Sequence, residues 1–161
     1  MRRVNTPLVS SHRSEPDPDL IHVNVASPAG AYTVGNASFF RYIVRLAEME
    51  LQLPTADREA LDVLALIPHA FDDAEEAARH SGRGWRLVPA RGHLDWATLE
   101  ATPQRLRSAL ERAHRILWEN AARAGVTPRE IAAIEVELDH VYGVLMRAEA
   151  GGYAVNISYT A

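Results

Sequence analysis

Four side chains that can bind metal recur along one stretch of the chain. They are spaced four, three and four residues apart, which would place them on one face of a helix: His69, Asp73, Glu76 and His80. Imidazole and carboxylate groups are ligands for zinc or manganese, so one interpretation is a metal site completed by His93 or by a second chain. The opposite face carries apolar residues such as Phe71, which is typical of an ordinary amphipathic helix. We prefer the amphipathic helix and keep the metal site as the alternative.

Two Glu-x-x-His pairs stand on the two helices that the sequence predicts best. They are Glu111 with His114, and Glu137 with His140. Paired Glu-x-x-His motifs hold metal in carboxylate di-iron bundles, where the side chains point into the bundle. At about 100° per residue, Glu111 and His140 lie roughly opposite the apolar stripes of their helices. We therefore expect solvated side-chain pairs, and we predict no cofactor.

The segment 30–38 lies between a predicted strand and a predicted helix, as a phosphate-binding loop does. Its glycine spacing matches the first half of that motif, but Asn36 stands where the motif needs lysine and Ala37 where it needs serine or threonine. The chain has no cysteine and no Gly-x-Ser-x-Gly sequence. The sequence therefore predicts neither nucleotide hydrolysis nor nucleophilic catalysis. More generally, it favours a protein without enzymatic activity.

Charge is segregated along the middle of the chain. From Asp57 to Glu76 there are seven acidic residues and one arginine, whereas residues 77–94 hold four arginines and no acid. Planar guanidinium groups beside a large aromatic ring can bind phosphate, a carboxylate cluster or an acidic partner. The candidate partner- or anion-binding residues are Arg79, Arg83, Trp85, Arg86 and Arg91. The alternative is an arginine-rich loop folded back onto the acidic helix beside it, with Trp85 buried.

Composition narrows the function classes. The net charge is −4 and all 17 basic residues are arginine, so a dedicated nucleic-acid binder is disfavoured. No apolar run approaches the length of a membrane span, and we expect a soluble cytoplasmic protein. Arginine in place of lysine, together with much alanine, suggests a bacterial chain from a GC-rich genome.

Strictly alternating segments near both ends predict the sheet. Leu20–Ala26 and Tyr153–Tyr159 alternate apolar and polar residues, and Ala31–Val34 could return as a further strand. Two lone strands are not stable in water, so the ends should share one sheet packed on the helices between them. We predict an α+β fold: a small antiparallel sheet formed by N- and C-terminal strands, covered by four or five helices. Residues 1–19 should be a flexible segment and 20–161 a single domain.

The helices follow from apolar spacing and from capping residues. Thr127 to Glu130 forms a capping box, and the short linker 125–127 predicts that the last two helices pack as a hairpin. A short strand is expected at Trp85–Val88 and a turn at Asp95–Ala101. The expected helices are Ala37–Leu53, a second one from Thr55 or Asp57 that Pro68 kinks before Gly82, a third from Pro103 to Gly125, and a fourth from Pro128 to Gly151.

The leading functional hypothesis is a non-enzymatic protein-binding domain of the immunity, antitoxin or accessory-subunit kind. Its partner would be another protein with an acidic contact surface, and a homo-oligomer stays open. The alternative is a small enzyme or ligand-binding protein that uses the metal site or a pocket against the sheet. Such a pocket would be lined by tyrosines: Tyr32, Tyr42, Tyr153 and Tyr159.

Overall fold

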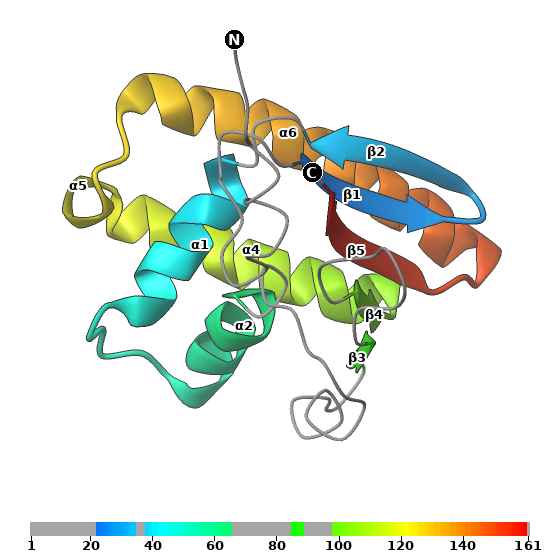
Figure 1. Ribbon diagram of the computed structural model, residues 1–161, viewed down its shortest axis with the longest axis horizontal. Helices are drawn as coiled ribbons and strands as arrows, with labels where there is room; N and C mark the ends of the chain where they lie inside the picture. The colour runs from blue at the N-terminus through cyan, green and yellow to red at the C-terminus, as the bar shows by residue number, and fades with distance from the viewer. Residues whose placement is uncertain (1–21, 35–37, 66–84, 89–97, 161) are drawn as a thin grey trace, which may run out of the picture.

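The computed structural model describes residues 22–34, 38–65, 85–88 and 98–160, and it is an α+β fold (Figure 1). The predicted fold class is therefore confirmed. The strands are β1 (His22–Ser27), β2 (Gly30–Val34), β3 (Trp85–Val88), β4 (Thr98–Ala101) and β5 (Val155–Thr160). The described helices are α1 (Ser38–Glu48), α2 (Thr55–Ala65), α4 (Pro103–Glu119), α5 (Ala121–Ala124) and α6 (Pro128–Gly151). The predicted N-terminal segment 1–19 lies outside the described residues.

The first and the last of the described strands, β1 and β5, lie side by side within the sheet. The five strands are antiparallel and their order is β2-β1-β5-β4-β3, so β1 and β5 pair directly, with Val25 opposite Ile157. The alternation seen in the sequence explains this pairing, because Val23, Val25 and Ile157 are all buried on one face. On the other face, Thr33 donates a hydrogen bond to Asn24 across β1 and β2, at 2.8 Å.

Strand β4 and the end of helix α1 differ from the sequence prediction. Residues 98–101 form strand β4 between β3 and β5, where we expected a turn. Helix α1 ends at Glu48 rather than at Leu53. It ends early because Arg58 of α2 donates hydrogen bonds to the carbonyls of Ala47 and Leu51, which stabilises an irregular connection.

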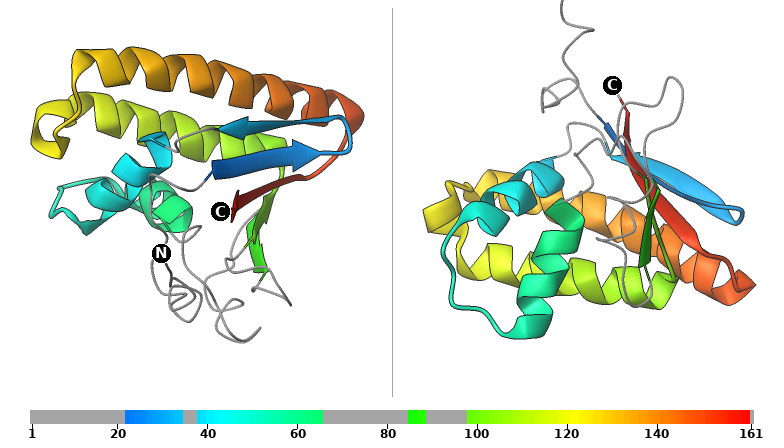
Figure 2. Two further views of the ribbon diagram at one scale, coloured as in Figure 1. Left: turned by 45° about the horizontal axis from the view of Figure 1, so that its top comes forward. Right: turned by 60° about the horizontal axis from the view of Figure 1, so that its bottom comes forward.

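Helices α4 and α6 run antiparallel, side by side, as the predicted hairpin (Figure 2). Thr127 caps α6 with the predicted capping box. The preceding helix is shorter than expected, because the side-chain amide of Asn120 donates to the carbonyl of Ile116 and α4 ends there. The short helix α5 then leads to Gly125, whose φ of 78° allows the turn into α6.

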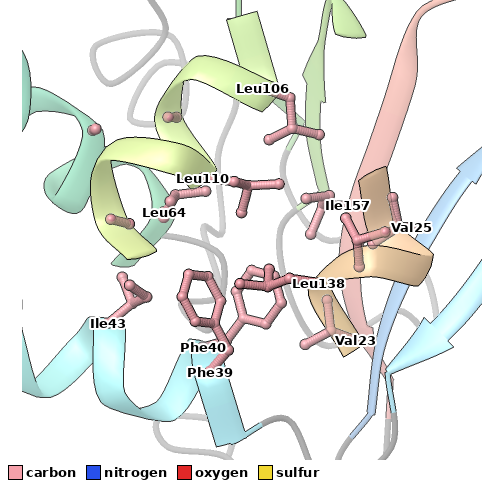
Figure 3. Packing of buried hydrophobic residues seen from close by; sticks show 14 of the residues in the cluster. Val23, Val25, Phe39, Phe40, Ile43, Leu64, Leu106, Leu110, Leu138 and Ile157 are labelled. Atoms are coloured by element: carbon pink, nitrogen blue, oxygen red, sulfur yellow. The ribbon is translucent and has the colours of Figure 1, made fainter. Parts of the chain in front are cut away.

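One hydrophobic core joins the sheet to the helices (Figure 3). Phe39 and Phe40 of α1 meet edge to face, with ring centroids 5.4 Å apart. Leu110 of α4 and Leu138 of α6 lie near them, towards Ile157 of the sheet. Because the apolar stripes of α4 and α6 are used in this core, the opposite faces of the two helices are available for other contacts.

Candidate functional site

The arginine-rich candidate site is described only in part. Trp85 and Arg86 belong to β3, whereas Arg79, Arg83 and Arg91 lie outside the described residues. Trp85 is half-buried against the core, and the guanidinium of Arg105 lies 4.9 Å from its ring centroid. Arg86 is exposed and its Nε donates to Glu100 of β4 at 3.0 Å. Because neighbouring side chains of a strand alternate, the structure places these two on opposite faces of the sheet.

The candidate metal ligands fall into two groups. His69, Asp73, Glu76 and His80, together with His93, lie outside the described residues. The Glu-x-x-His residues are described: His114 lies edge-on to Phe39, with centroids 6.5 Å apart, and His140 stacks on Tyr32 at 4.7 Å. Within the described part of the chain, no group of three or more histidine, aspartate or glutamate side chains could hold a metal ion.

A continuous groove runs along the hairpin between α4 and α6. It consists of two adjoining hollows of about 540 and 310 Å³ that share Glu111 and Tyr142. We call it the α4–α6 groove, and its lining is Arg107, Glu111, His114, Arg115, Trp118, Glu119, Glu135, Tyr142, Met146, Glu149 and Ala150.

Two large apolar side chains of the groove are exposed. Trp118 on α4 is 56% exposed and Met146 on α6 is 63% exposed. Each follows a buried leucine, Leu117 or Leu145, and one residue turns a helix by about 100°, away from the core. Exposed tryptophan and methionine in a groove are typical of binding surfaces. Neither residue was predicted from the sequence as a site residue, although both lie outside the apolar stripes of their helices.

Ion pairs stand at the two ends of the groove. Arg107 pairs with Glu149 at 2.9 Å, and Arg115 pairs with the buried Asp57 at 2.7 Å and with Glu119 at 3.5 Å. Between these ends, neither Glu111 nor Glu135 has an arginine partner among the described residues. The middle of the groove is therefore acidic.

The floor of the groove contains two buried polar atoms that lack a hydrogen-bond partner among the described residues. They are Nε2 of His114 and the hydroxyl oxygen of Tyr142. Glu135 lies 3.5 Å from His114 Nε2, but the contact does not satisfy it as a hydrogen bond. Burial, reinforced by the carboxylates of Glu111 and Asp139, raises the pKa of Tyr142 to about 12. A buried polar atom without a partner costs about 1–3 kcal/mol, so these two atoms reduce the stability of the fold beneath the groove.

Glu137, outside the groove, carries a third buried atom without a partner in the described part of the chain. Burial of its carboxyl raises the pKa of Glu137 above the ordinary value. A carboxyl group whose pKa is higher in the folded than in the unfolded state stabilises the fold at pH values below its unfolded pKa. This stabilisation is lost as the pH rises through the folded pKa. At pH 7 the ionised carboxylate of Glu137 should therefore destabilise the fold.

We expect Glu137→Gln to raise the melting temperature at pH 7 by about 1–2 °C, because the amide removes the buried charge. The gain should shrink as pH falls and vanish below about pH 4, where the wild-type carboxyl is protonated in both states. Thermal unfolding followed by circular dichroism between pH 3 and 8 measures this. Glu48→Gln, at an exposed carboxyl of α1, is the control. An equal gain for both variants, or one independent of pH, would contradict the assignment.

In comparisons with protein-family models, with curated proteins and with solved structures, the chain finds no match. No helix among the described residues is long and apolar enough to cross a lipid bilayer. A function for the chain is therefore inferred from the geometry of the α4–α6 groove.

Proposed function

We propose that this chain is a non-enzymatic protein-binding domain of the immunity, antitoxin or accessory-subunit kind, and that it binds its partner through the α4–α6 groove. The observation that carries the proposal is the exposure of Trp118 and Met146 in one continuous groove. Interfaces derive most of their binding energy from a few such anchors, and tryptophan and methionine are enriched among interface residues.

The shape of the groove favours a protein over a small molecule. Along α4, the lining extends from Arg107 to Glu119, which at 1.5 Å per residue is about 18 Å. Small-molecule sites instead bury most of their ligand in one concave cavity.

A bacterial origin and a cytoplasmic location belong to the same proposal, and the arginine-for-lysine composition supports a GC-rich genome. The arginine residues between 79 and 91 stay a predicted second contact, which would suit an acidic patch on the partner. Arg86 contributes less to such a contact than its charge suggests, since Glu100 already pairs with it.

The proposal predicts that native mass spectrometry of the protein, purified gently from its own host, finds a second polypeptide in a fixed ratio. Trp118→Ser and Met146→Ser should each weaken this complex by about tenfold or more, because each removes an anchor. Val136→Ser is the matched control: Val136 is also apolar, on α6 and 59% exposed, but it does not line the groove.

Two results would contradict the proposal. One is a complex that survives both anchor substitutions unchanged, which would remove the groove from the interface. The other is a lone chain that carries the mass of a metal or small molecule, which would favour the ligand-binding alternative.

A further inference from the structure

We infer that the partner element bound in the α4–α6 groove is an amphipathic α-helix with a lysine or arginine at the centre of its apolar face. This inference rests on the proposed function, which requires only that some protein occupies the groove.

The charges of the groove favour a cationic side chain on the partner. Its lining contains four carboxylates, Glu111, Glu119, Glu135 and Glu149, against two guanidinium groups, Arg107 and Arg115. The two guanidinium groups are already paired, and Arg115 also compensates the buried Asp57. Glu111, which lines both hollows, and Glu135, which lines the hollow of Trp118, have no arginine partner in the described part of the chain. An anionic partner would be repelled here, whereas a basic side chain is attracted.

The two carboxylates lie where this basic side chain would enter. Glu111 and Tyr142 line both hollows, and His114 and Glu135 line the second beside them. An ammonium or guanidinium group carries only donors. It can donate to the carboxylate oxygens of Glu111 and Glu135, which also balance its charge.

The walls of the groove favour a helix over an extended segment. Both walls are α-helices, and their backbone groups are hydrogen-bonded within each helix. An extended peptide would find no strand edge to pair with and would leave its own backbone groups unpaired against apolar side chains. A third helix satisfies its own backbone and packs into the seam of a helical hairpin.

The spacing of the anchors defines the partner sequence. Trp118 shares a hollow with Glu135, and eleven residues separate Glu135 from Met146 along α6. This corresponds to about 16 Å, or three helical turns. The partner helix should therefore present apolar residues about eleven positions apart on one face, with the cation between them, opposite Glu111, which lines both hollows.

A symmetric homodimer in which groove faces groove is disfavoured, because it would bring two acidic surfaces together.

The test uses the complex purified from the host, with photo-methionine incorporated in place of methionine. The chain has three methionines, Met1, Met49 and Met146, so cross-links are assigned to Met146 by peptide mapping. We expect Met146 to cross-link to a partner segment of at least about twelve residues with helical apolar spacing and a lysine or arginine among its apolar positions.

A second experiment compares two double variants, each of which removes two negative charges. Glu111→Gln with Glu135→Gln should weaken the complex by about tenfold or more and make its affinity less sensitive to salt. Glu48→Gln with Asp62→Asn, on exposed residues of α1 and α2, should change neither. Melting temperatures of both double variants exclude misfolding as the cause.

The outcomes separate the two proposals. If Trp118→Ser releases the partner but the groove charge variant binds like wild type, the groove binds a protein and the basic helix is wrong. A cross-link from Met146 to an acidic or strand-forming segment, to residues 1–21 of this chain, or to a second copy also overturns the basic helix. If no second polypeptide is found, or the complex survives both Trp118→Ser and Met146→Ser unchanged, the proposed function fails and the inference fails with it.

Discussion

Arg112→Met with Arg115→Met is expected to lower the free energy of unfolding by about 3–5 kcal/mol, because it leaves a buried carboxylate without its partners. The side chain of Asp57 is 3% exposed, and its two oxygens accept from Arg112 at 2.8 Å and from Arg115 at 2.7 Å. These ion pairs join α2 to α4. For a domain of this size, the loss corresponds to about 6–20 °C in melting temperature.

The free energy of unfolding should change with pH in opposite directions in the wild type and in the double variant. Hydrogen bonding from Arg115, helped by Arg112, holds the pKa of Asp57 below its ordinary value against the effect of burial. In the wild type this contribution is present above the unfolded pKa of aspartate, about 4, and is lost as pH falls through the lower folded pKa. In the double variant, burial without partners should raise the pKa of Asp57, so stability should increase as pH falls towards 4.

A third variant separates the buried charge from the lost side chains. Adding Asp57→Leu to the double variant replaces the whole cluster by apolar groups and should recover most of the stability, as buried ion pairs often tolerate this exchange. Chemical denaturation of the wild type and both variants at pH 4 and 7 measures these effects. A double variant as stable as the wild type would mean that water reaches Asp57 and that the cluster contributes little.

The sheet was predictable where the sequence pattern was long enough. Val23 and Val25 in β1 alternate with polar residues over a whole strand, and so do Val155 and Ile157 in β5. Strand β4 has four residues, of which Leu99 is the large buried one, and a period of two cannot be recognised over so short a run.

The helix boundaries that differed depend on side chains that bind backbone carbonyls. Helix α1 ends where Arg58 of α2 binds the carbonyl of Ala47, and α4 ends where the side-chain amide of Asn120 donates to the carbonyl of Ile116, four residues earlier. The sequence shows Arg58 and Asn120, but not which carbonyls they reach. Capping by a neighbour in the same segment, as by Thr127 of α6, was predictable because the motif is local.

The α4–α6 groove could not be predicted from periodicity alone. The apolar spacing along α4 and α6 includes Leu117 and Leu145, and it leaves Trp118 and Met146 beside the apolar stripe without saying whether another element covers them. That the two flank one groove follows from the register of two antiparallel helices, which depends on the connection through Asn120 and Gly125. The arginine-rich segment between residues 79 and 91 was predicted as a binding site instead, because the segregation of charge can be recognised in the sequence.

Leu145→Ala is expected to lower the free energy of unfolding by about 2–5 kcal/mol, whereas Met146→Ala should change it by no more than about 0.5 kcal/mol. The two residues are neighbours on α6, but Leu145 is 0% exposed and Met146 is 63% exposed. Removing the leucine leaves a cavity among the helices and the sheet. Removing the methionine exchanges one solvent-facing side chain for another with good helix propensity.

Denaturant unfolding of both variants, combined with the affinity of each for the copurified partner, measures two separate properties of one helix. Leu145→Ala should destabilise the chain, while Met146→Ala should weaken the complex in a chain that stays folded. The pair Leu117→Ala and Trp118→Ala on α4 should repeat the contrast, since Leu117 is buried and Trp118 lies in the groove. If Met146→Ala destabilised the chain as much as Leu145→Ala, the exposed face of α6 would belong to the fold. The contrast between neighbours therefore tests whether these helices hold the core with one face and a partner with the other.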